Sequence, residues 1–142
     1  MNITRRNIAR ATIGACGPVA LIAGSSFVAP AEAAPTVTWM DCTIYSYAPD
    51  VYNGKVRGGG GMNCDAGHPG VFHTYLDKYN SNTGQWVESA HNSFTTSNAS
   101  VQLDALAGCP GGPGLYRSRT WFDAVNYYDE PVAVTGGVTR TC

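Results

Sequence analysis

Apolar and polar residues alternate along most of the chain after residue 34, and turn-forming residues recur about every ten positions. Phe72, Thr74 and Leu76 fall on one face of the segment 71–79. The opposite face of that segment carries Val71, His73, Tyr75 and Asp77. A repeat of two residues is that of a β-strand, whose successive side chains point to opposite faces. The pattern therefore predicts β structure rather than helix.

About seven short strands follow from this pattern, and they predict an all-β fold of two packed sheets or a small barrel. The segments that carry the pattern are 36–47, 51–56, 71–79, 85–88, 101–106, 115–125 and, around Gly136 and Gly137, the closing pair 132–135 and 138–142. Asn53 and Gly54 predict a tight hairpin turn within 51–56. A short helix at 100–106 stays open as the alternative to a strand there.

Four consecutive glycines occupy positions 58–61, after Lys55 and Arg57. A glycine-rich run beside basic residues suggests a phosphate-binding loop. The run lacks the helix and the Gly-Lys-Ser/Thr ending that such a loop needs. We therefore expect a flexible connection or a bulge at this point.

The first 33 residues differ in composition from the rest and resemble a secretory signal peptide. Arg5 and Arg6 precede a moderately apolar run at 11–29, and small residues surround Ala33. A basic end, an apolar centre and a small-x-small cleavage site are the features of such a signal. The paired arginines leave two routes open, twin-arginine export and general secretion. We expect cleavage after Ala33 and a single extracellular domain at 34–142, which contains no apolar stretch long enough to span a membrane.

Four cysteines remain once Cys16 is removed with the signal, and these are Cys42, Cys64, Cys109 and Cys142. An even number in an exported chain indicates two disulfides. Of the three pairings, we favour Cys42–Cys64 with Cys109–Cys142, because sequential partners close shorter loops. Each bridge would stabilise the fold by about 3–4 kcal/mol by restricting the unfolded chain. The wide spacing, with no C-x-x-C pair, argues against a metal site.

Charge and motif content exclude several classes of function. The segment 34–142 has nine acidic and six basic residues, which gives a net charge of −3 with neutral histidines. That charge disfavours nucleic acids and anionic membranes as partners. The sequence contains no G-x-S-x-G, no metal-ligand spacing among His68, His73 and His91, and no cofactor-binding motif. We therefore predict no catalytic residues, no cofactor and no metal.

One predicted strand carries the strongest candidate for a binding surface. Alternation places Arg117, Arg119 and Trp121 on one of its faces. Tyr127 and Tyr128 continue the aromatic run beyond it. Arginine beside tryptophan is chemistry that recognises partner proteins or sugars. The alternative is a core tryptophan covered by the apolar stems of the arginines.

The segment after Cys109 is the second candidate. Pro110 and Pro113, with the glycines around them, oppose both helices and strand ladders. We therefore expect a stiff, irregular loop anchored by a disulfide. A stiff exposed loop binds at low entropic cost. A plain crossover loop is the alternative.

The cysteine layout resembles that of small secreted two-disulfide β proteins typical of actinobacteria. Cys109-Pro110 is similar to the start of the reactive loop in the subtilisin-inhibitor family, and Cys142 is similar to the C-terminal-edge cysteine of tendamistat-type amylase inhibitors. The apo-chromoprotein family shares the plan of a seven-stranded sandwich. The chain departs from all three: glycines follow Pro110, a Trp-Arg-Tyr triplet is absent, and the loops between paired cysteines are longer. The resemblance therefore implies architecture alone.

These features together predict an exported protein that binds rather than catalyses. Inhibition of, or docking to, a secreted partner protein is the first hypothesis. Binding of carbohydrate or cell wall through exposed aromatic side chains is the second. A small secreted hydrolase is the third.

Overall fold

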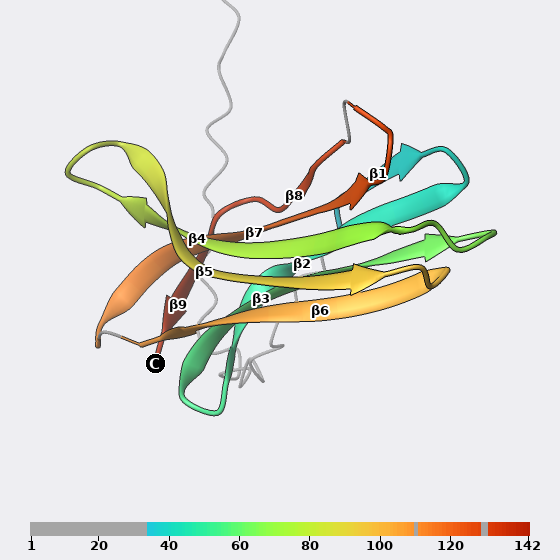
Figure 1. Ribbon diagram of the computed structural model, residues 1–142. Helices are drawn as coiled ribbons and strands as arrows, with labels where there is room; N and C mark the ends of the chain where they lie inside the picture. The colour runs from blue at the N-terminus through green and yellow to red at the C-terminus, as the bar shows by residue number, and fades with distance from the viewer. Residues whose placement is uncertain (1–33, 110, 129–130) are drawn as a thin grey trace, which may run out of the picture. The chain divides into compact units, whose positions relative to one another are not determined.

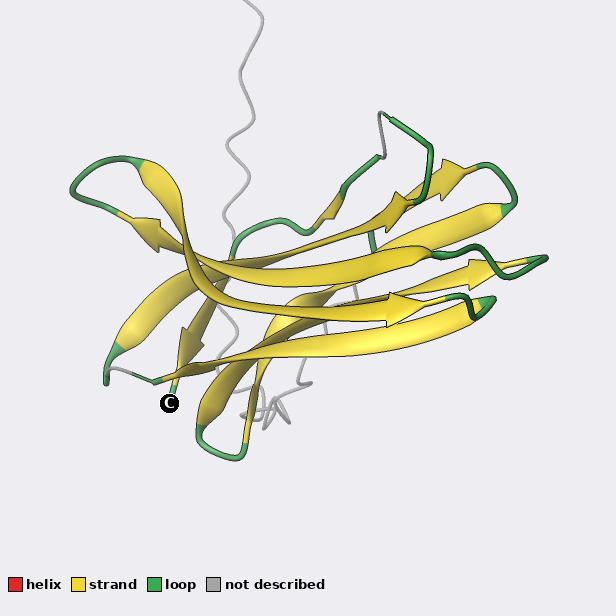
Figure 2. Ribbon diagram, viewed as in Figure 1, coloured by secondary structure: helices red, strands yellow, loops and turns green. Residues whose placement is uncertain are grey.

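The computed structural model describes residues 34–109, 111–128 and 131–142, and these form two antiparallel β-sheets (Figure 1). The described residues contain strands and loops but no helix (Figure 2). The predicted fold class, all-β with two sheets and two disulfides, is confirmed. The alternative of a helix at 100–106 is wrong, since this segment is a strand. The predicted signal peptide lies outside the described residues, and within them no helix is available to cross a membrane.

The first sheet has four strands in the order β1-β2-β3-β6. These strands are β1 (Thr36–Trp39), β2 (Cys42–Tyr52), β3 (Lys55–Cys64) and β6 (Ser100–Gly108). Asn53 and Gly54 connect β2 to β3 with φ of 49° and 70°, the left-handed backbone of the predicted hairpin turn. The prediction of one continuous strand at 36–47 is wrong. Met40, with φ of 54°, and Asp41 turn the chain between β1 and β2.

The second sheet has the order β5-β4-β7-β8, and β9 also pairs with β7. Its strands are β4 (Gly70–Asn80), β5 (Gln85–Thr96), β7 (Pro113–Ala124), β8 (Ala133–Val134) and β9 (Val138–Thr141). Strand β5 is longer than the predicted segment 85–88. Strand β7 begins at Pro113, inside the segment predicted to be irregular. Because β4 lies between β5 and β7, its side chains have neighbours on both flanks.

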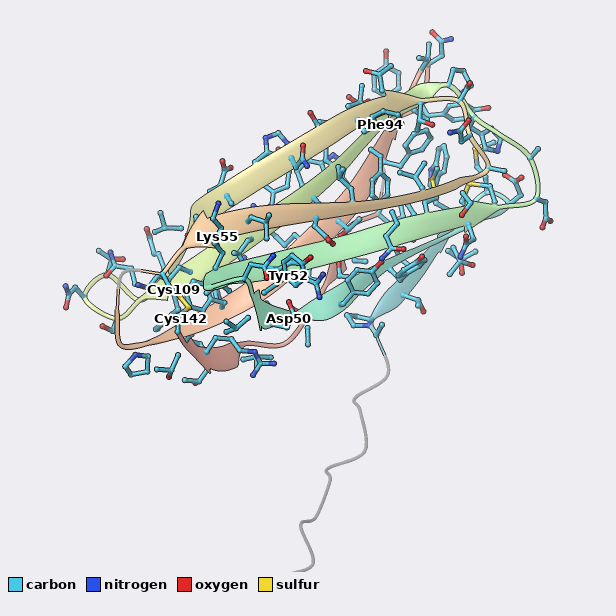
Figure 3. All side chains as sticks on the ribbon, turned by 90° about the horizontal axis from the view of Figure 1, so that it is seen from below. Asp50, Tyr52, Lys55, Phe94, Cys109 and Cys142 are labelled. Atoms are coloured by element: carbon cyan, nitrogen blue, oxygen red, sulfur yellow. A yellow bond between two sulfur atoms is a disulfide. The ribbon has the colours of Figure 1, made fainter. Side chains whose placement is uncertain are left out.

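Both predicted disulfides are present. Cys42 and Cys64 are cross-strand partners and join β2 directly to β3. Cys109 is bonded to Cys142 (Figure 3), which ties the end of β9 to the segment that follows β6. Two disulfides are typical of extracellular proteins.

The run of four glycines is not the predicted flexible connection, because it lies within β3, but a bulge does occur beside it, in β2 between Tyr47 and Asp50, opposite Gly58. Gly58 and Gly60 face the second sheet. An added Cβ at Gly60 would collide with the Thr120 hydroxyl and the Tyr45 carbonyl, and one at Gly58 would lie 2.8 Å from Ser118 Oγ. The close approach of β3 to β7 therefore requires glycine. We call this contact of Gly58 and Gly60 with Ser118 and Thr120 the waist.

The waist divides the buried core into two apolar clusters. The cluster beside the first disulfide contains Cys42, Ile44, Met62, Phe72, Val101, Phe122, Ala124 and Ala133. The other cluster contains Val56, Leu76, Ala105, Ala107 and Tyr116. At the waist, Ser46 Oγ lies 2.8 Å from both Thr120 Oγ1 and the Ala133 carbonyl oxygen. These buried hydroxyls are therefore hydrogen-bonded, as burial requires.

Replacing Gly60 with alanine is expected to destabilise the fold by about 3 kcal/mol, near the upper end of what overpacking a core costs. The new Cβ would meet a backbone carbonyl and the β-branched Thr120, and neither can swing away. Gly108→Ala is the matched control, because a Cβ there meets no atom within 4 Å. Chemical denaturation of the oxidised protein measures both variants. Equal denaturation midpoints for the two variants would show that the close contact at the waist does not require glycine at position 60.

Candidate functional site

Strand β7 presents Arg117, Arg119 and Trp121 on the face that points away from the first sheet. The residues between them, Ser118 and Thr120, are buried at the waist. The alternation predicted for this strand is therefore observed. Trp121 is half-buried, as are both arginines, so this tryptophan is not part of either core cluster. We call this side of the sheet the outer face of the second sheet.

Four aromatic rings from three strands stack in parallel on this face, and we call His73, Tyr75, His91 and Trp121 the ring stack. The Tyr75 ring lies between the His91 ring, 4.1 Å away, and the Trp121 ring, 4.5 Å away, at interplanar angles of 16° and 9°. His73 lies 5.1 Å from Trp121 and 5.5 Å from His91. Both flat faces of Tyr75 are therefore covered, and the surface that it leaves to solvent is the ring edge.

A buried carboxylate holds both arginines in place. Asp77 is only 2% exposed. It accepts hydrogen bonds from Arg117 Nε at 2.9 Å and from Arg119 Nε and Nη2 at 2.6 and 3.0 Å. The Arg119 guanidinium also lies 4.7 Å from the Tyr75 ring centroid, and that of Arg117 lies 4.5 Å from the Trp86 ring centroid. Arginines that are ion-paired, hydrogen-bonded and stacked keep little rotamer freedom.

A β-bulge brings Trp86 onto the same face as the ring stack. Trp86 and His91 are five positions apart, so simple alternation would place them on opposite faces. The register between β4 and β5 shifts after Leu76, which leaves Ser89 as an extra residue in β5. The shift returns Trp86 to the outer face. The outer face of the second sheet therefore extends from the ring stack past Asp77 to Trp86.

The two histidines of the ring stack form a contact that depends on protonation. His73 Nδ1 lies 3.2 Å from His91 Nε2. Partial burial lowers the pKa of His73, and the positive charge of protonated His91 lowers that pKa further. Two neutral rings can share one N–H···N hydrogen bond, whereas two protonated rings have only donors and repel each other. We therefore expect acid to weaken the contact between His73 and His91.

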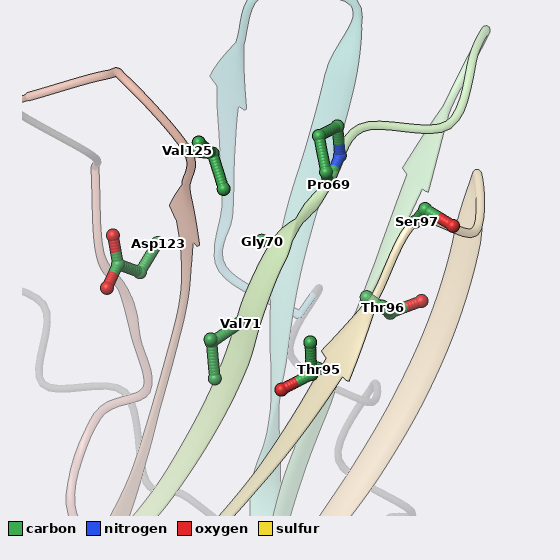
Figure 4. A pocket seen from close by; sticks show the side chains of 8 residues that line it. All are labelled: Pro69, Gly70, Val71, Thr95, Thr96, Ser97, Asp123 and Val125. Carbon is green, nitrogen blue, oxygen red and sulfur yellow. The ribbon is translucent and has the colours of Figure 1, made fainter.

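A hollow of about 440 Å³ adjoins the ring stack on the same face (Figure 4). Three of its lining residues are Val71, Thr95 and Asp123, which lie side by side on β4, β5 and β7. Along their strands, Val71 is two residues from His73 and Asp123 is two residues from Trp121, so the hollow is next to the ring stack. The other lining residues are Pro69, Gly70, Thr96, Ser97 and Val125. The Asp123 carboxylate is the one charged group in this lining. The hollow therefore offers apolar and hydroxyl surface with a single anionic group.

Of the remaining predicted site residues, those that the structure describes do not join this face. Tyr127 packs against the tryptophan of β1, with ring centroids 5.3 Å apart. Tyr128 is 89% exposed beyond the end of β7. Pro113 begins β7 and Trp121 lies near its end, which separates them by about 26 Å of extended chain. Pro110 lies outside the described residues.

Several members of this face were not among the predicted site residues, namely His73, Tyr75, Asp77, Trp86 and His91. A signal for three of them existed, because alternation in 71–79 places His73, Tyr75 and Asp77 on one face. The strand order β5-β4-β7 then brings that face beside the arginines of β7.

A second polar cluster lies beside the first disulfide. His68 Nε2 is 2.5 Å from Asp41 Oδ1, and this hydrogen bond lowers the pKa of Asp41. The sulfurs of Cys42 and Cys64 and a ring nitrogen of His68 lie within 4.8 Å of one another. A disulfide, however, offers no thiolate to a metal ion. The contact is best described as a hydrogen bond that holds the β1–β2 turn.

Comparison of the chain with protein-family models, with curated proteins and with solved structures finds no match. No family match therefore supports the similarities in cysteine layout, which remain resemblances.

Asp77→Ala is expected to destabilise the protein by about 1–3 kcal/mol, because it leaves two half-buried arginines without their shared acceptor. Asp65→Ala is the control, since Asp65 is an exposed carboxylate with no described side-chain partner. Chemical denaturation of both variants measures the difference. An unchanged midpoint for Asp77→Ala would show that the arginines do not depend on it.

The contribution of His73 to stability is expected to fall as pH drops below about 6.5. Its pKa is lower in the folded protein than the ordinary value of 6.5, so between these two pKa values the unfolded chain binds more protons. The free energy of unfolding therefore decreases through that window and is level on either side of it.

His91→Gln removes the neighbouring positive charge and is expected to raise the pKa of His73 toward its ordinary value. An NMR titration of the His73 ring measures this change. A pKa that stays where it is in the unmodified protein would rule out coupling between the two rings.

Proposed function

We propose that the protein is exported and binds a partner protein through the outer face of its second sheet. The observation that carries the proposal is the pair of arginines that Asp77 fixes beside the ring stack. Side chains that are held before binding lose little conformational entropy on binding. The arrangement therefore suits recognition of a partner by a surface that is already in its bound conformation.

The composition of the face supports a protein as the partner. Tryptophan, tyrosine and arginine are the residues that dominate binding energy at protein interfaces, and they act best at the centre of a patch beside a pocket. Here Trp121, Tyr75 and Arg119 lie together, and the 440 Å³ hollow beside them has room for an anchoring side chain of the partner.

The orientation of the rings favours a protein over a sugar at this face. Sugars bind aromatic residues by laying their C–H surface on an open ring face, which carries the negative end of the ring quadrupole. Both faces of Tyr75 are covered by its neighbours. The tyrosine hydroxyl, the ring N–H groups and the guanidinium groups of this face are suited to hydrogen bonds with backbone and side-chain groups of a polypeptide.

Export is supported by the composition of the first 33 residues and by the two disulfides. An exported protein that binds a protein meets its partner outside the cytoplasm. We therefore propose a secreted partner, and inhibition or docking as the outcome of binding.

The immobilised, oxidised protein is expected to capture one partner from culture supernatant at about 1:1 stoichiometry. Arg119→Ala and Trp121→Ala should each weaken capture by about tenfold or more, as central interface residues do. Leu106→Ala is the control, because Leu106 is 45% exposed on the opposite sheet. Capture that both variants retain in full would contradict the proposal. Retention on insoluble polysaccharide that requires Trp121 would favour the sugar hypothesis for this face instead.

A further inference from the structure

Two cysteines and a histidine converge beside the turn between β1 and β2. Cys42 begins β2, Cys64 ends β3, and His68 lies in the loop that leads to β4. Their ligand atoms, which are the two sulfurs and one ring nitrogen, lie within 4.8 Å of one another. Within the part of the chain that the structure describes, no other three metal-ligating side chains come so close together. The sequence separates these residues widely, and the pairing of β2 with β3 brings them together.

The backbone holds the two cysteines side by side independently of the bond between their sulfurs. Cys42 and Cys64 are direct partners in the antiparallel ladder of β2 and β3. The amide of Cys64 also donates a hydrogen bond to the Ala99 carbonyl at 2.7 Å. Directly opposed residues in such a ladder keep their Cβ atoms about 4.5–5.5 Å apart. The two sulfurs therefore stay neighbours when the disulfide is reduced.

The Asp41 carboxylate holds the His68 ring in place. Asp41 Oδ1 lies 2.5 Å from His68 Nε2, and Asp41 Oδ2 accepts a hydrogen bond from the Ala66 amide at 2.9 Å. The Trp39 ring meets the histidine ring edge to face, with centroids 6.2 Å apart. A carboxylate that orients the ring is the common companion of a histidine that binds a metal ion. The histidine is therefore positioned as a ligand before any ion arrives.

The size of the cluster fits a zinc ion. Three atoms that lie within 4.8 Å of one another share a centre no more than about 2.8 Å from each, and zinc bonds measure about 2.3 Å to sulfur and 2.0–2.1 Å to nitrogen. Once the S–S bond is broken, side-chain rotation can separate the sulfurs to the about 3.8 Å that tetrahedral zinc requires. Thiolate and imidazole are also the ligand types that favour zinc over magnesium or calcium.

A metal ion and the disulfide compete for the same two sulfurs, because only thiolates bind the ion. Every cysteine of a newly made chain is a thiol, and disulfides form and persist only in an oxidising compartment. The reduced cluster is therefore a state through which each molecule passes.

We infer that Cys42, Cys64 and His68 bind one Zn²⁺ ion before the first disulfide forms, with Asp41 as the residue that positions the histidine. Binding of the ion releases the protons of the two thiols. A disulfide-containing oxidant then takes two electrons from the two thiolates, which join as the S–S bond and release the ion. The oxidant accepts two protons from water and leaves as two thiols. The inference goes beyond the proposed function and does not depend on it, because it concerns the reduced protein and a different part of the fold.

Titration with Co²⁺ of the protein reduced by a phosphine tests this inference, because Co²⁺ takes the place of zinc and its absorption reports its ligands. One equivalent of Co²⁺ is expected to produce thiolate-to-cobalt absorption, and Zn²⁺ should displace it with a Kd below about 1 µM. Excess Zn²⁺ should raise the Tm of the reduced protein by about 5 °C or more, since it binds the folded state. The Tm of the oxidised protein should not change. Absence of the thiolate absorption, or a Tm of the reduced protein that Zn²⁺ leaves unchanged, would overturn the inference.

The second pair of cysteines supplies the matched control. Replacing Cys42 and Cys64 together with serine should abolish the thiolate-to-cobalt absorption of the reduced protein. Replacing Cys109 and Cys142 together with serine should leave that absorption unchanged. Absorption that is lost with the second pair instead of the first would place the ion elsewhere and overturn the inference.

His68→Gln tests the third ligand in a chain that keeps all its cysteines, and it serves where the serine variants do not fold. It should raise the Kd for Zn²⁺ about tenfold or more, whereas His91→Gln, the matched control, should leave the Kd within about twofold. Asp41→Asn should raise the Kd about 10–100-fold, as loss of a group that orients a metal ligand does. Equal affinities of the His68→Gln and His91→Gln variants would overturn the inference. Partner capture by the oxidised protein does not involve these residues, so its outcome is independent of this one.

Discussion

The close contact between β3 and β7 is the constraint on which the rest of the structure depends. Two sheets with ordinary side chains pack about 10 Å apart, but Gly58 and Gly60 bring their backbone against Ser118 and Thr120. Small hydroxyl side chains fit this space and find hydrogen bonds there, as Ser46 and Thr120 do. The apolar core is consequently split, and each half is filled by its own set of aromatic and aliphatic residues.

The waist also sets which residues reach solvent. Once Ser118 and Thr120 are fixed inside, alternation forces Arg117, Arg119 and Trp121 to the outer face of the second sheet. In β3 the same rule sends Gly59 and Gly61 outward, where the absence of side chains leaves room for Tyr47 and Tyr45 of β2. A slip of one residue in β7 would move Arg119 and Trp121 into the waist, and a slip in β3 would move Val56 and Met62 out of the core. The register is therefore strongly specified, and with it the geometry of both outer faces.

Alternation and cysteine spacing were sufficient to predict the all-β class, the disulfide pairing and the inward and outward residues of β4 and β7. They could not show that glycines 58–61 form part of a strand, because glycine is unfavourable in a strand unless another element approaches closely. That approach is a property of the tertiary structure. For the same reason, only part of the candidate face could be predicted from the sequence. The sequence places His73, Tyr75 and Asp77 on one side of β4, but only the strand order puts them beside β7, and only the bulge at Ser89 adds Trp86.

The two outer faces use aromatic residues in opposite ways, and the difference follows from what lies beneath each ring. On the second sheet every neighbouring strand contributes a ring, so the rings stand upright and cover one another, and arginines held by Asp77 fill the remaining positions. On the first sheet Gly59 and Gly61 contribute no side chain, so Tyr47 and Tyr45 of β2 occupy the space above them. One stretch of four glycines thus determines the close packing on its inner side and leaves room for two tyrosines of β2 on its outer side.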